Sequence, residues 1–188
     1  MATLDSFLEK IERKLSEEEP VVPNERMASV AIILRKRRGF DALLIKRVER
    51  SSDPWSGQIA FPGGRREPAD SSLVETAMRE TREETGIDLK SHGGLLGYFG
   101  TFRTHTGTML VAPCLFLLND RVKVRTNAEV ASFRWVPFST FSNARSKSEY
   151  LLERGDFRQS FPAYKYEDYV IWGLTHRIIS SLVSTNED

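Results

Sequence analysis

The sequence predicts an α/β domain in which helices flank a mixed β-sheet. Segments rich in Val, Ile and Leu, each of strand length, alternate along the chain with segments whose apolar residues recur at helical spacing. The chain has 188 residues, of which 40% are hydrophobic and 28% are charged, as in an ordinary globular protein. That length is enough to bury one core, so we expect residues 1–188 to form a single domain.

An amphipathic helix is expected over residues 1–19. Charged residues separate apolar residues that recur at helical spacing, namely Leu4, Phe7, Leu8, Ile11 and Leu15. Pro20 disfavours helix in the residue before it, which sets the end of the helix. We expect the apolar side to dock on the domain or on a partner.

Several later segments have the composition of strands. The first two are separated by the sequence RKRRGFD, whose glycine and polar residues are typical of a hairpin turn. These two strands should therefore pair. The predicted strands are residues 27–34, 42–48, 58–61, 95–102, 109–118 and 131–136.

A closing helix is predicted over residues 165–183, where Val170, Leu174, Ile178 and Leu182 recur at helical spacing. The preceding residues, 143–164, are polar and aromatic. We interpret this long segment as a loop that covers a substrate.

Residues 61–87, FPGGRREPADSSLVETAMRETREETGI, join a glycine-rich turn to a short helix. Ser72 and Glu75 form a capping box, and Gly86 follows as a C-terminal cap. The helix is therefore expected over residues 72–85.

Three glutamates near the end of this helix share one face, because Glu80, Glu83 and Glu84 stand at spacings of three and four residues. Their like charges repel, so something positive should lie against them. Carboxylate oxygens are hard ligands that suit Mg²⁺ or Mn²⁺, and Mg²⁺ usually binds through one or two carboxylates together with substrate phosphates. The pattern predicts a metal-assisted phosphate site.

This stretch resembles the Nudix box, whose pattern ends in Arg-Glu-x-x-Glu-Glu-x-Gly before an apolar residue. The residues that carry the resemblance are Gly64, Arg79, Glu80, Glu83, Glu84, Gly86 and Ile87. The resemblance implies a Nudix-type α/β/α sandwich with a mixed sheet and a metal-binding loop-helix-loop. It also implies a diphosphate hydrolase that uses Mg²⁺ or Mn²⁺ and water attack at phosphorus.

The resemblance also assigns roles to individual residues. By the family's pattern, Glu80 and Glu84 are direct metal ligands, and the carbonyl of Gly63 is a further candidate ligand from the turn. Glu83 is either a ligand or the base that acts through water. Arg79 stands four residues before Glu83 and is expected to orient its carboxylate.

The general base comes from different places in Nudix enzymes, including loops outside the box. Glu83 is the first candidate. Glu129, just before the strand at residues 131–136, is the second candidate for the base, or a ligand for an additional metal.

Within the family, the chain is most similar to the coenzyme A pyrophosphatase branch. As in that branch, the spacer between Gly64 and Arg79 is one residue longer than usual. Asp70 is the early acid, and counting back from Arg79 puts Ser71 where Glu is common. Other similar segments, within residues 27–179, are 43–47, 57–64, 111–113 and 171–175. The branch's signature has an Arg four residues before Gly57, where this chain has Asp53.

Arginines near the diphosphate are candidate substrate contacts, because guanidinium groups pair bidentately with phosphate oxygens. The candidates are Arg47, Arg65, Arg66 and Arg103, and Trp55 is a candidate to stack on a nucleobase.

Composition limits the partners and the location. The formal net charge of +1 gives no general attraction to nucleic acid or to an anionic membrane. The single cysteine, Cys114, lies in an apolar run and is expected to be a small buried residue. No apolar run approaches the length of a membrane span, and the acidic N-terminal segment differs from a signal or transit peptide. We expect a cytoplasmic protein that binds a small-molecule nucleotide. The family resemblance implies that it forms a homodimer.

The leading substrate is coenzyme A or a derivative, with 3′,5′-ADP and 4′-phosphopantetheine as products. The enzymatic alternative is hydrolysis of ADP-ribose, a dinucleotide or a nucleoside triphosphate. A third reading is a Nudix module that binds a nucleotide without cutting it, although such a module need not keep all three glutamates.

Overall fold

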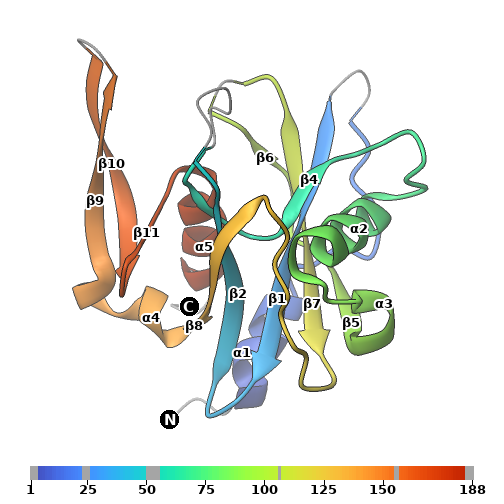
Figure 1. The fold of residues 1–188 in the computed structure, drawn as a ribbon. Coiled ribbons are helices and arrows are strands. Elements are labelled where there is room, and N and C mark those ends of the chain that lie inside the picture. Colours follow the sequence, from blue (N-terminus) through green and yellow to red (C-terminus); the bar gives the residue numbers. More distant parts are fainter. Residues whose placement is uncertain (1–3, 23–25, 50–55, 106, 155–156, 185–188) are drawn as a thin grey trace.

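The computed structural model describes residues 4–22, 26–49, 56–105, 107–154 and 157–184. A mixed sheet lies between two helical layers (Figure 1). Alternate residues of the central strand face opposite layers: Ile32 packs in one cluster with Ile178 of the C-terminal helix, whereas Ile33 packs in another with Ala77 of the box helix. The predicted α/β/α sandwich is confirmed.

The sheet combines parallel and antiparallel pairing. β1 and β7 run parallel, in register from Met27↔Leu110 to Leu34↔Leu117. β1 also pairs antiparallel with β2 and β4, β2 with β3 and β8, and β7 with β5 and β6. Each of the predicted strand segments overlaps one or two of these strands. The observed strands of the main sheet are β1 (Met27–Lys36), β2 (Phe40–Arg47), β3 (Ile59–Ala60), β4 (Gly63–Arg65), β5 (Gly93–Tyr98), β6 (Phe102–Arg103), β7 (Leu110–Leu118) and β8 (Val130–Pro137).

Cys114 of β7 is fully buried, as the sequence predicted. Its Sγ lies 3.3 Å from the hydroxyl oxygen of Ser29 on β1, and that hydroxyl donates to the carbonyl of Ala112 at 3.0 Å. Burial raises the pKa of the Cys114 thiol to about 12. The thiol is therefore part of the packed core at the parallel pair.

The N-terminal helix, α1 (Leu4–Glu12), ends at Glu12, before the predicted end at residue 19. Ile11 is fully buried, in the cluster that also contains the C-terminal helix. Beyond α1 the chain turns toward the sheet, where Ser16 and Tyr98 exchange two backbone hydrogen bonds of 3.0 and 2.8 Å. This pairing with β5 satisfies backbone groups that a longer helix would have used.

The box helix, α2 (Leu73–Thr85), agrees with the predicted residues 72–85. The Ser72 hydroxyl accepts from the N–H of Glu75 at 3.1 Å, and Gly86 closes the helix with a left-handed φ of 69°. The Glu75 carboxylate reaches back to the N–H of Ser71, not to that of Ser72. The capping box is thus present with its second bond moved by one residue. A short helix that the sequence did not predict, α3 (Leu89–His92), follows.

The prediction for residues 143–183 is largely wrong. Within this range, β9 (Lys147–Arg154), β10 (Phe157–Tyr166) and β11 (Tyr169–Trp172) form a separate antiparallel sheet in the order β11-β10-β9, which extends away from the main sheet in Figure 1. The closing helix, α5 (Gly173–Ser184), begins only where the predicted helix is almost half complete. The other elements are α4 (Ser139–Ser142) and a 3₁₀ turn (Ala144–Ser146).

The physical reason is a tight turn that the helical pattern concealed. Tyr166 pairs with Tyr169 across Glu167, whose positive φ of 51° suits a two-residue hairpin. Alternate residues of β11 are then buried, with Tyr169 and Ile171 inward. None of the helices in the described ranges is long and apolar enough to cross a membrane.

Candidate active site

Two adjacent glycines place the backbone of the turn against the box helix. Gly63 and Gly64 lie in β4, opposite Val30 and Ser29 of β1. Gly63 has a φ of 155°, and a Cβ on it would overlap the carbonyl of Ser29. A Cβ on Gly64 would overlap the carboxylate of Glu80. The missing side chains therefore make the space in which a carboxylate lies directly against the turn.

Glu84 is the most deeply buried of the three glutamates, with a side chain that is 2% exposed. The Gly63 N–H donates to its Oε2 at 2.9 Å, and Arg47 Nη1 lies 3.5 Å from its Oε1. Burial raises the pKa of the Glu84 carboxyl to about 7; the Gly63 hydrogen bond and Arg47 lower it, and the nearby charges of Glu80 and Glu129 raise it. A cation beside Glu84 would favour its charged form.

Arg79 is the cation that faces the other two glutamates. Its Nη1 lies 2.9 Å from Oε1 of Glu80 and 3.4 Å from Oε2 of Glu83. Burial raises the pKa of the Glu80 carboxyl, and Arg79 lowers it. The expected contact between Arg79 and Glu83 is present, but Glu80 is the nearer partner. Glu83 is 54% exposed, so water reaches it most easily.

Asp70, the displaced early acid, faces Arg79. Both of its oxygens accept from the Arg79 guanidinium, and it also accepts from the Thr76 hydroxyl and the Glu67 N–H at 2.9 Å. The Arg79 hydrogen bond is the main reason that the pKa of the Asp70 carboxyl falls to about 2. Asp70 thus anchors the arginine that faces the glutamates.

The loop that carries Glu129 passes the end of the box helix. The Asn127 N–H donates to the Glu84 carbonyl at 3.3 Å, and the Glu129 carbonyl accepts from Val48 at 2.9 Å. The Glu129 side chain is exposed, and its charge raises the pKa of Glu84. The loop that carries Glu129 therefore passes Glu84, although it comes from a different segment of the chain than the box helix.

A sequence model of the NUDIX domain matches residues 25–154 of the chain. The chain belongs to the Nudix hydrolase family. It is similar over nearly its whole length to an uncharacterized Nudix hydrolase, NudL, of Yersinia enterocolitica, at 32% identity over 96% of this chain and 91% of the relative. It is also 31% identical to the human mitochondrial coenzyme A diphosphatase NUDT8, over 79% of this chain and 64% of that protein.

Solved structures agree with this Nudix fold. The crystal structure of a MutT protein from Methanosarcina mazei covers 92% of this chain and 100% of its own, with a TM-score of 0.54 at 22% identity. Nudix hydrolases cleave nucleoside diphosphate derivatives and generally need divalent metal ions.

The donor groups of this Nudix hydrolase suit a hard divalent cation. Glu80 and Glu84 are carboxylates with raised pKa values, and the missing side chain of Gly64 lets the Glu80 carboxylate lie against the turn. Across the described ranges, however, no three His, Cys, Asp or Glu side chains already gather as a metal-ion cluster. Glu80 and Glu83 face Arg79, and Glu84 faces the Gly63 N–H. Side-chain rotations around these contacts would be needed to bring the carboxylates onto one ion.

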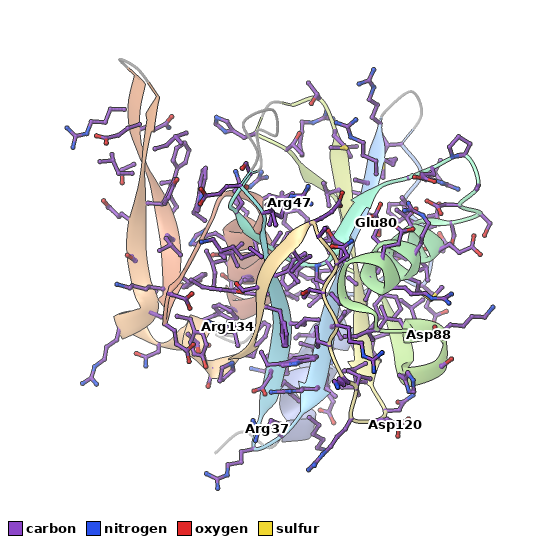
Figure 2. The ribbon with its side chains drawn as sticks, viewed as in Figure 1. Arg37, Arg47, Glu80, Asp88, Asp120 and Arg134 are labelled. Carbon is purple, nitrogen blue, oxygen red and sulfur yellow. The ribbon has the colours of Figure 1, made fainter. Side chains whose placement is uncertain are left out.

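The predicted substrate arginines are not all in one place. Arg47, at the end of β2, lies at the same end of the main sheet as Glu80, whereas Arg37 lies at the opposite end (Figure 2). Arg65 is exposed on β4, and its carbonyl accepts from Arg79 at 3.1 Å. The structure therefore brings the Arg47 side chain to Glu84 and the backbone of Arg65 to Arg79.

The other candidates for substrate binding lie elsewhere or are already engaged. Arg66 pairs with Glu19 at 3.0 Å. Arg103 lies on β6, where its Nη1 donates to the carbonyl of Gly107 at 3.1 Å. Trp55, and with it Asp53, lies outside the described residues. Sequence reasoning missed Glu19, because a contact across dozens of residues has no local signal.

Proposed function

We propose that this Nudix hydrolase is a Mg²⁺- or Mn²⁺-dependent diphosphatase of coenzyme A or a coenzyme A derivative. The products would be 3′,5′-ADP and 4′-phosphopantetheine. The similarity to the human mitochondrial coenzyme A diphosphatase carries the substrate part of this proposal. The lengthened spacer between Gly64 and Arg79, which contains Asp70, agrees with it.

In this proposal, Glu80 and Glu84 hold the divalent ion, together with the carbonyl of Gly63. A bound divalent ion would neutralise phosphate oxygens and make water a stronger nucleophile. Glu83 accepts the proton of the attacking water, because it is the most exposed of the three glutamates. The water oxygen bonds to phosphorus, the bridging P–O bond breaks, and the leaving phosphate keeps the electron pair.

Arg47 and Arg65 are the proposed contacts to the diphosphate. Arg47 lies 3.5 Å from Glu84, so an anion held by its guanidinium would be next to the glutamates. Glu129 is the alternative base, since its loop passes Glu84. A homodimer and a cytoplasmic location stay predictions.

Product analysis by mass spectrometry tests this proposal. The protein is incubated with Mg²⁺, and separately with Mn²⁺, in parallel reactions with coenzyme A, ADP-ribose, NADH and nucleoside triphosphates. The expected result is the fastest release of 3′,5′-ADP from coenzyme A, with little release by Glu84→Gln purified in the same way. That control separates the protein's own activity from a contaminant.

Two other outcomes would each replace part of the proposal. Faster cleavage of ADP-ribose or another substrate would discard coenzyme A and keep the reaction class. Nucleotide binding without cleavage of any substrate, at any metal concentration, would favour a binding module.

A further inference from the structure

Glu19 reaches the start of the box helix from the N-terminal part of the chain. Its Oε2 accepts from the backbone N–H of Leu73, the first residue of α2, at 2.7 Å and from the Tyr98 hydroxyl at 3.1 Å. Its Oε1 accepts from Arg66 Nη1 at 3.0 Å. A carboxylate at this point satisfies a free helix N–H and also complements the positive end of the helix dipole.

The backbone that presents Glu19 is itself fixed to the sheet. Ser16, three residues earlier, exchanges two backbone hydrogen bonds with Tyr98 of β5. The approach is close, because a Cβ on Gly97 would lie 2.8 Å from the Ser16 carbonyl oxygen. The segment that carries Glu19 is thus anchored to β5, and the same strand supplies Tyr98, the partner of the Glu19 carboxylate.

From Glu19, a continuous series of contacts leads to the glutamates. Arg66 Nη2 donates to the Ser71 carbonyl at 2.9 Å and to the Asp70 carbonyl at 3.4 Å, just before α2. The Asp70 carboxylate then holds Arg79, and Arg79 faces Glu80. The N–H of Leu73 and the loop before it are therefore both tied to one carboxylate.

We propose that Glu19 is a positioning residue for the metal-binding face of α2. It fixes the start of the helix, and thereby sets the position of Glu80 and Glu84 relative to the glycine turn. Glu19 lies outside residues 25–154, which match the NUDIX domain. This inference rests on the proposed role of the α2 glutamates as metal ligands.

The test compares Glu19→Gln with Glu18→Gln. Glu18 is an exposed neighbour with the same charge, so it is the matched control. Free Mn²⁺ is measured by electron paramagnetic resonance during titration of each protein without substrate. Amide hydrogen exchange is followed in residues 71–85 under the same conditions. Both readouts are made well below the unfolding temperature.

Glu19→Gln is expected to weaken Mn²⁺ binding about tenfold and to speed exchange at the start of α2, whereas Glu18→Gln changes neither. With substrate, kcat at limiting metal should fall while KM stays close to that of the wild type. A folded Glu19→Gln with wild-type Mn²⁺ affinity would overturn the proposal, even if its melting temperature falls, because a purely stabilising contact predicts that result.

If Glu19→Gln does not fold, Glu19→Asp takes its place. It keeps the charge, but it is too short to reach both Leu73 and Arg66 in the same position, so a loss of Mn²⁺ affinity is again expected and wild-type affinity again overturns the proposal. Glu84→Gln tests separately whether the α2 glutamates bind the metal, on which this inference rests. If it binds Mn²⁺ as the wild type does, the metal assignment fails, and hydrogen exchange alone then decides whether Glu19 fixes the helix start.

Discussion

Asp70 holds Arg79 by two parallel hydrogen bonds, from Nε to Oδ1 and from Nη2 to Oδ2, each 3.0 Å long. The remaining nitrogen of the guanidinium, Nη1, is the one that faces Glu80 and Glu83. Asp70 therefore sets the direction in which Arg79 presents its charge. Asp70 thus influences the charge that faces Glu80 and Glu83 through its hydrogen bonds to Arg79.

Asp70→Asn should lower the free energy of unfolding by about 2 kcal/mol above about pH 5. The folded pKa of Asp70 is lowered from 3.8 to about 2, so the charged carboxylate stabilises the fold above the unfolded pKa, and this stabilisation is lost as the pH falls through about 2. Urea unfolding of both proteins at several pH values checks this. The gap between them should narrow below about pH 4; a gap of constant size would contradict the prediction.

The raised pKa of Glu84 predicts that its contribution to stability depends on pH in the opposite direction. Its folded pKa is raised from 4.5 to about 7, so its contribution to stability is fully present below the unfolded pKa and is lost as the pH rises through about 7. With a chelator present, the wild type should lose about 3 kcal/mol relative to Glu84→Gln between about pH 5 and pH 8. Added Mn²⁺ should reverse the loss in the wild type only. Parallel pH curves in urea unfolding would exclude a raised pKa.

Glu84→Gln should lose about 100-fold or more of the diphosphatase activity while keeping the fold. The change removes the buried charge with little change in volume. Glu153→Gln is the matched control, because Glu153 is 59% exposed on β9, in the sheet that extends from the body. Steady-state rates and circular dichroism are measured together. Near-wild-type turnover of Glu84→Gln at saturating Mg²⁺ would remove Glu84 from the ligand set.

Gly64→Ala should separate function from stability. Its Cβ would overlap the end of the flexible Glu80 side chain, which can move aside at small cost in stability but then leaves its place in the site. We expect at least about a tenfold loss of metal affinity with little change in melting temperature. Gly63→Ala should instead destabilise the fold, because its Cβ would overlap backbone. Gly39→Ala, which meets nothing within 4 Å, is the control; equal melting temperatures in all three would contradict this reasoning.

The sequence predicts the box helix well because its signals are local. Ser72 accepts at the first turn and Gly86 adopts the left-handed cap, and both residues lie next to the helix they define. The glycine turn is similar, since two adjacent residues determine how closely the backbone approaches Glu80.

The C-terminal region is harder to predict because one set of apolar residues fits two periods. Val170 continues the helical spacing of Leu174, yet it lies on β11, where Tyr169 and Ile171 are buried on the other side. Pairing with β10 decides the outcome, because the tight turn at Glu167 joins the two strands inside the predicted helix. Contacts such as Leu73 with Glu19 are also set by the tertiary fold alone.

The buried thiol of Cys114 gives this protein an internal reporter. With a pKa of about 12 and no other cysteine in the chain, it should be almost inert to alkylating reagents in the native state. Any labelling would record excursions in which β1 and β7 part. The labelling rate of the native enzyme therefore measures how often the strand beneath the glycine turn opens, without a mutation or a dye on the surface.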